Sequence, residues 1–149
     1  PLPESQLDRF LMCVTLGYPD PAAERALLLG ADRRAMLTSM PAVMSAEELL
    51  QVQAGLRAIH ASGAVVDYVL ALVHATRAPG VFADGLSPRA ALALLQAARA
   101  WAALEGRDHV TPDDVQAVLL PVCAHRLHAA QGSTDSRTLL RQLLLTIPV

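Results

Sequence analysis

An arginine stands in the first turn of a predicted helix, where residues 87–95 read SPRAALALL. Ser87 is a favourable N-cap residue and Pro88 suits the first helical position, so Arg89 follows directly inside the helix. Because a helix N-terminus carries positive partial charge, a cation there is disfavoured by about 0.3–1 kcal/mol. A second predicted helix start, TPDD at 111–114, has two acids after its proline, as the dipole favours.

An arginine at this position is favourable if an anion binds at the start of the helix. The unpaired N–H groups at a helix start attract anions, and the planar guanidinium matches the oxygens of a phosphate. The alternative is an Arg89 side chain that extends into water or pairs with Asp84. The residues themselves leave both interpretations open.

The composition favours packed helices and excludes several classes of protein. Of the 149 residues, 53% are apolar but only 3% are aromatic, and alanine and leucine supply the bulk. The net charge of -2 gives no basic field for nucleic acid. No apolar stretch approaches the roughly 18 residues of a membrane span, and no signal peptide is evident, so we expect a cytoplasmic protein without a transmembrane segment. Cys13 and Cys123 are expected to be free thiols.

The sequence contains no lysine, since all 12 basic residues are arginine. A phosphate-binding P-loop requires the lysine of GxxxxGK[ST]. The chain therefore contains no P-loop.

Hydrophobic periodicity and capping signals predict an all-α fold with a single strand. The strand is expected over residues 11–16, and it would lack a partner within the chain. In the helix expected within 60–77, four apolar residues fall on one face: Val66, Val69, Leu70 and Val73. The other helices are expected at 21–30, 45–59, 87–105, 112–128 and 137–147, with a loop or broken helix over 31–45.

Three blocks of sequence resemble one family. They are PLPESQLDRFLMCVTLGYPDPAAERALL, VVDYVLALVHATR, and GLSPRAALALLQAARAWAALEGRDHVTPDDVQAVLLPVCAHRL. Together they look like the C-terminal lid of a MoxR-family AAA+ ATPase up to about residue 130. The resemblance implies an AAA+ lid-type bundle of five to six helices, with the strand left over from a missing α/β core. It implies three segments: the end of the core (1–20), the helical lid (21–130), and a linker with a C-terminal helix (131–149).

The resemblance also implies roles for two arginines. Arg89, in the motif with Ser87 and Pro88, would be the sensor-2 residue that reaches the γ-phosphate of ATP. Arg9, in LDRF, would be an arginine finger acting on the nucleotide of the neighbouring subunit; its alternative is a pair with Glu4 or Asp8. ATP and Mg²⁺ would be bound by the full-length protein and not by this chain alone, and no metal site is expected within the chain.

The family implies a ring, expected to be a hexamer, that hydrolyses MgATP and remodels or matures client proteins. A protein with a von Willebrand A-type domain is an expected partner, and nucleic acid is not. This chain alone is expected to be inactive, since it has neither a Walker A nor a Walker B motif. The competing hypothesis is an autonomous helical protein-interaction module without nucleotide chemistry.

Three further features are open to more than one interpretation. His125 and His128 have an i, i+3 spacing that could ligate a metal, but ordinary histidines are favoured because no third ligand is evident. Asp67, inside an apolar helix, is expected to pair with an arginine such as Arg57 or to cap a loop. The leucines of helix 137–147 fit equally a helix that folds back on the lid and one that binds another subunit.

Overall fold

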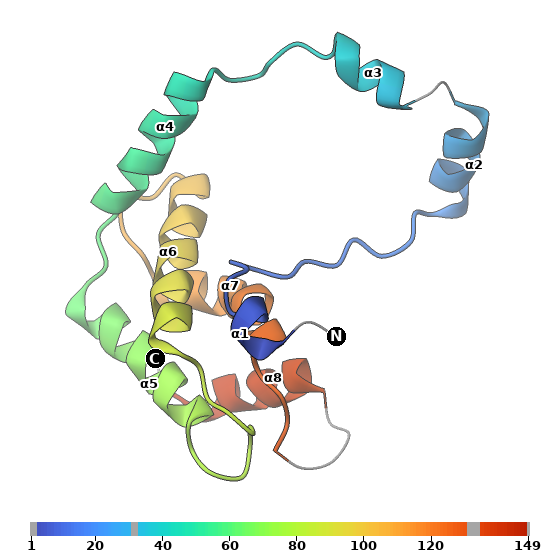
Figure 1. Cartoon of the computed structure of the whole chain (residues 1–149). Coiled ribbons are helices and arrows are strands. Elements are labelled where there is room, and N and C mark those ends of the chain that lie inside the picture. The colour runs from blue at the N-terminus through green and yellow to red at the C-terminus, as the bar shows by residue number, and fades with distance from the viewer. Residues whose placement is uncertain (1–2, 31–32, 131–134, 149) are drawn as a thin grey trace. The chain divides into compact units, whose positions relative to one another are not determined.

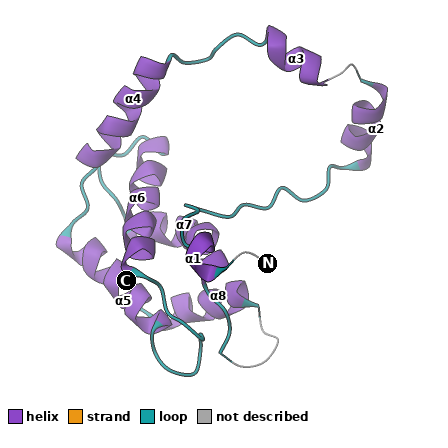
Figure 2. Ribbon diagram, in the orientation of Figure 1, coloured by secondary structure: helices purple, strands orange, loops and turns teal. Residues whose placement is uncertain are grey.

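The computed structural model describes residues 3–30, 33–130 and 135–148, which contain eight α-helices and no strand (Figure 2). An all-α fold is thus confirmed. The chain divides into two compact units: residues 1–13 with 53–149, and residues 14–52. No helix within the described ranges combines the length and the apolar character needed to cross a membrane.

The first unit is a helical bundle built around α6 (Figure 1). α6 packs most extensively against α7 and also contacts α5, while α8 packs against α5 and α7. The core includes a fully buried leucine from each of these four helices: Leu72, Leu94, Leu119 and Leu140. The bounds are α1 Glu4–Leu7, η1 Leu56–Ala58, α5 Gly63–Thr76, α6 Pro88–Leu104, α7 Pro112–Cys123, η2 Ala124–Arg126 and α8 Ser136–Thr146.

Local capping chemistry fixes both ends of α6 and the start of α7 as predicted. The Ser87 hydroxyl accepts a hydrogen bond from the Ala90 N–H at 3.1 Å, and Pro88 is the first helical residue. Gly106, with φ +73°, follows α6 in the left-handed conformation that glycine adopts without strain. Thr111 and Asp114 form a capping box at the start of α7. α7 ends at Cys123 and a 3-10 turn follows, so the helix is shorter than expected.

The predicted apolar face of α5 is partly wrong. The helix turns Val65, Tyr68 and Leu72 into the core together with Val69 and Val73. Val66 is half-buried and Leu70 is 42% exposed; both line an apolar cleft of about 430 Å³ against Leu92 and Leu95 of α6, among other residues. The whole helix is so apolar that spacing alone did not single out the buried side.

The C-terminal helix α8 folds back on the first unit. Leu140 and Leu143 are buried in the common core, and Leu139, Leu144 and Ile147 pack against it. α8 contacts α5, α7 and η2. Of the two alternatives for this helix, intramolecular packing is the one the structure adopts.

The predicted strand over residues 11–16 is not formed. These residues are exposed, and one backbone hydrogen bond, from Cys13 N–H to the carbonyl of Pro121 at 2.7 Å, ties this segment to α7. A β-branched, apolar sequence needs a neighbouring strand to pair with, and the described residues provide none.

The second unit consists of short helices without a core of their own. α2 covers Pro21–Leu29, α3 covers Arg33–Ser39, and α4, Ala46–Gly55, begins here. Local caps define the starts of α2 and α4. Asp20 accepts from Ala22 N–H and Ala23 N–H at 2.9 Å, and Ser45 and Glu48 form a reciprocal capping box at 3.1 and 2.7 Å. None of the described side chains of residues 14–52 is buried.

The acid Asp114 does more than complement the helix dipole. Its carboxylate is 1% exposed and receives both Arg107 Nη atoms at 2.6 Å, as well as the Thr111 N–H at 2.7 Å. The Arg107 guanidinium, with the Thr111 hydrogen bonds, holds the pKa of Asp114 below its ordinary value, against the opposing effect of burial.

We expect Asp114→Asn to destabilise the chain by about 1–2 kcal/mol at neutral pH, since it weakens both the capping box and the pairing with Arg107. Because the folded-state pKa is depressed, the ionised carboxylate stabilises the fold above its unfolded pKa of about 3.9, and this contribution is lost as the pH falls through the folded value. Urea unfolding from pH 7 down to pH 3 measures this. The Asp113→Asn variant, at the exposed neighbouring position, is the control and should keep the wild-type pH dependence.

Both cysteines are free thiols, but they differ in their exposure to solvent. Cys13 is exposed, whereas Cys123 is completely buried in α7, and burial raises the pKa of Cys123 to about 12. Because the thiolate is the reactive form, we expect iodoacetamide at pH 8 to modify one cysteine per native chain and both after unfolding. Mass spectrometry should find the native label on Cys13, and Cys13→Ser should abolish it. Native labelling of Cys123 would contradict the buried position.

Candidate functional site

Asp8 joins the start of α6 to η2. Its carboxylate accepts the Ser87 hydroxyl at 3.1 and 3.2 Å and the Arg126 Nε at 3.1 Å. Arg89 Nη1 lies 3.9 Å from Asp8 Oδ2, at the outer limit of an ion pair. One carboxylate thus contacts the N-cap residue and the first-turn arginine of the same helix.

Arg126 holds the segment around Asp8 in place. Its side chain is only 4% exposed. Besides the Asp8 carboxylate, its guanidinium donates to the carbonyls of Asp8 at 3.3 Å, Leu11 at 3.1 Å, and Phe10 and Val122. His125 adds a contact, with Nε2 3.2 Å from the Phe10 carbonyl oxygen, and burial lowers the pKa of this imidazole. The LDRF segment is therefore bound to the bundle chiefly through one buried guanidinium.

The loop before α6 is fixed to the end of α5, which sets where the helix begins. The Thr76 hydroxyl accepts the Leu86 N–H at 3.0 Å, and the Arg77 guanidinium donates to the Leu86 carbonyl at 3.0 and 2.8 Å. Gly85 lies directly against Arg77: a Cβ there would be 2.3 Å from Arg77 Cγ and 2.7 Å from its Cα. Only glycine allows this approach without displacing backbone.

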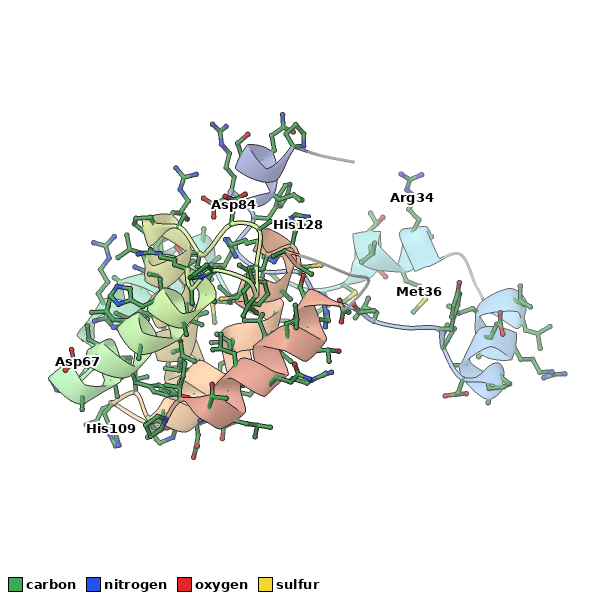
Figure 3. The ribbon with its side chains drawn as sticks, turned by 90° about the horizontal axis from the view of Figure 1, so that it is seen from below. Arg34, Met36, Asp67, Asp84, His109 and His128 are labelled. Carbon is green, nitrogen blue, oxygen red and sulfur yellow. The ribbon has the colours of Figure 1, made fainter. Side chains whose placement is uncertain are left out.

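Arg89 points largely into solvent from this fixed start. Its side chain is 62% exposed, and Asp8 is its one ion-pair partner among the described residues. The alternative pair with Asp84 is not formed. Asp84 instead lies on the loop beside α1 (Figure 3), where it lines a shallow cleft of about 200 Å³ with Ser5, Asp8, Gly85, Leu86, Ser87 and Arg126.

Arg9 is exposed and forms no ion pair with any side chain in the described ranges, Asp8 included. The side chain of Glu4, its other alternative partner, lies outside what the structure describes. Through its neighbour Asp8, Arg9 is nevertheless attached to the same helix start as Arg89. The structure therefore brings the two predicted site segments together.

Sequence reasoning missed the residues that make this connection. Asp8 was considered only as a partner for Arg9, and Arg126 was not considered. The contact joins residues 118 positions apart, so no local spacing rule could reveal it. The one local signal was Arg126 itself, an arginine near the end of the predicted 112–128 helix to which no partner had been assigned.

The other features singled out in the sequence do not form the arrangements that were considered for them. Asp67 is exposed on α5 (Figure 3) and makes no ion pair with Arg57 in the described part of the chain. His125 lies in the 3-10 turn η2 and His128 beyond it, so the two do not share a helix. Among the described residues, no three His, Cys, Asp or Glu side chains are grouped so as to hold a metal ion.

Comparison with known proteins places the bundle in a family. Residues 70–143 match the AAA lid domain family. The chain is 40% identical over 138 residues to Chaperone MoxR1 of Mycobacterium tuberculosis, covering 85% of this chain and 36% of that protein. It is 34% identical over 172 residues to Protein MoxR of Paracoccus denitrificans, covering 99% of this chain and 51% of that protein.

The fold has a matching crystal structure, that of a candidate ATPase from Cytophaga hutchinsonii. The TM-score is 0.84 at 27% sequence identity, over 99% of this chain and 49% of the other. The chain thus spans about half or less of the length of the relatives it matches. Sequence and fold agree: the chain belongs to the MoxR family of AAA+ ATPases, and its residues 70–143 form an AAA lid domain.

Proposed function

We propose that the chain is the lid portion of an ATPase that couples ATP binding and hydrolysis to the remodelling or maturation of partner proteins, with Arg89 contacting the γ-phosphate. The observation that carries this proposal is that the Arg89 side chain is exposed and only loosely paired. A guanidinium in the first turn of a firmly anchored helix is 62% exposed, and its ion pair with Asp8 is long, at 3.9 Å. Such a cation is available to an anion that approaches the helix start.

Asp8 gives Arg89 a partner when no phosphate is present. A γ-phosphate carries more charge than one carboxylate and offers several acceptor oxygens, so it competes favourably for the guanidinium. Exchange of Asp8 for phosphate would then be a contact made in one nucleotide state and absent from the other. A conformational switch requires such a difference. Ser87 and Pro88 serve this site by fixing the start of the helix.

Arg9 is proposed as the arginine finger that acts on the nucleotide of a neighbouring subunit. Its exposure and the lack of an ion pair with described residues support this role, and the Asp8 contacts anchor the segment that carries it. The subunits would form a ring, proposed to be a hexamer, that uses ATP with Mg²⁺ in the cytoplasm. The ring is proposed to act on client proteins together with a partner that has a von Willebrand A-type domain. One relative is itself named a chaperone.

The test is steady-state hydrolysis of MgATP by the longer protein that joins this chain to a P-loop domain, compared with this chain alone. We expect turnover from the longer protein and none from the chain alone, because it contains no lysine and hence no P-loop. A folded longer protein without turnover would contradict the proposal. If it bound partners equally well with and without ATP, the interaction-module hypothesis would be favoured instead.

A further inference from the structure

A second pair of arginines lines a cleft elsewhere on the first unit. Arg57 comes from η1 and Arg99 from the later turns of α6, ten residues beyond Arg89. Gln53, Leu56 and Gln96 complete the lining of a cleft of about 320 Å³. This volume is at the small end of those that hold small-molecule ligands and is about ten times the share of one water molecule.

Neither arginine has a partner within the described part of the chain. Neither forms an ion pair or donates a hydrogen bond there, and Asp67, the expected partner of Arg57, is not paired with it. None of the described residues that line the cleft is acidic. Two half-buried arginines of this unit do have acidic partners: Arg107 pairs with Asp114, and Arg126 pairs with Asp8.

The strongest indication of a ligand is the Nε atom of Arg99. It is covered from solvent and donates no hydrogen bond to a described residue. A covered N–H without an acceptor costs about 1–3 kcal/mol, and such donors in native proteins usually have a partner that explains them. An acceptor entering the cleft would supply that partner after a small shift of the side chain.

We propose that this cleft binds an oxyanion with at least two acceptor oxygens, a phosphate or carboxylate group, held by the guanidinium groups of Arg57 and Arg99. Each planar guanidinium presents a fork of donors that matches two oxygens of such a group, and two forks together neutralise two negative charges. The side-chain amides of Gln53 and Gln96 supply further donors at the rim. This site is separate from Arg89 and does not depend on the proposed ATPase function.

The experiment is isothermal titration calorimetry of the full 149-residue chain with inorganic pyrophosphate and, separately, with glutarate, at constant ionic strength. We expect saturable binding of at least one probe with a dissociation constant on the order of 1 mM or lower. Binding of pyrophosphate alone identifies a phosphate site, and binding of glutarate alone identifies a carboxylate site. Saturable binding of neither would overturn the proposal.

Four variants assign the binding to this cleft. Arg57→Gln and Arg99→Gln should each raise the dissociation constant at least about tenfold, because each removes charge-assisted hydrogen bonds. The matched control is Arg141→Gln, which removes one charge from an exposed position of α8 and should leave binding unchanged. Equal weakening in Arg141→Gln, or loss of binding in Arg89→Gln with retention in Arg99→Gln, would overturn the proposal. Because Arg57 is exposed, its variant remains informative if Arg99→Gln fails to fold.

Discussion

Arg89→Ala, in the longer protein that carries the P-loop domain, is expected to lower the turnover number for ATP at least about 100-fold. A cationic side chain at the transferring phosphoryl group contributes to the rate on the order of 10³–10⁵ in related chemistry, so removal of one such contact is a large effect. The same substitution should hardly change stability. Arg89 is 62% exposed and its pair with Asp8 spans 3.9 Å, and exposed pairs of this kind contribute about 0–1 kcal/mol.

A variant that loses ATP turnover but keeps its folding stability identifies Arg89 as a phosphate contact. Steady-state hydrolysis gives the turnover number, and thermal unfolding of the same preparations shows whether the bundle is intact. Arg141→Ala, also on an exposed helical position of this unit, should hydrolyse ATP at the wild-type rate. A folded Arg89→Ala protein with wild-type turnover would show that the arginine at the helix start is only a surface residue.

Arg126→Met is expected to lower the free energy of unfolding by about 3 kcal/mol and to release residues 3–13 from the bundle. The substitution keeps a long apolar stem but removes the guanidinium donors to the Asp8 carboxylate and to the carbonyls of Phe10 and Leu11. Asp8 would keep only the Ser87 hydroxyl and the distant Arg89. Few other contacts tie this segment to the first unit, so its order depends strongly on one side chain.

Urea unfolding measures the loss of stability, and tryptic cleavage after Arg9 measures the release of the segment. Cleavage there should be slow in the wild type and much faster in Arg126→Met, because trypsin requires an extended and accessible backbone. Arg141→Met changes the same residue type at an exposed position and should behave as the wild type. Unchanged cleavage in a folded Arg126→Met protein would mean that other contacts anchor the segment.

The elements whose ends depend on neighbouring residues could be predicted from the sequence. Ser45 with Glu48, Ser87 with Pro88, and Thr111 define helix starts through hydrogen bonds that span three residues, so the sequence contains all that is needed. Gly106 ends α6 for an equally local reason, its positive φ. These caps placed Arg89 correctly on its helix.

The features that failed, or were missed, depend on residues far apart in the chain. A strand over residues 11–16 required a partner that the described residues do not supply. The buried side of α5 is set by how α6, α7 and α8 pack around it, and not by its own apolar pattern. The carboxylate of Asp8 finds Arg126 only after the whole bundle has formed. The candidate site was therefore predicted in its parts, while their connection through Asp8 was not.

The link between Asp8 and Arg126 has a consequence for how the chain is made. A ribosome adds about 5–20 residues per second, so the 118 positions between these residues correspond to roughly 6–24 seconds of synthesis. During that interval the LDRF segment has been synthesised but Arg126, which anchors it, has not. Phe10 and Leu11, which are exposed even in the finished fold, present apolar surface during this time. The LDRF segment therefore reaches its final place only after Arg126 has been synthesised, and its exposed apolar side chains must stay unaggregated until then.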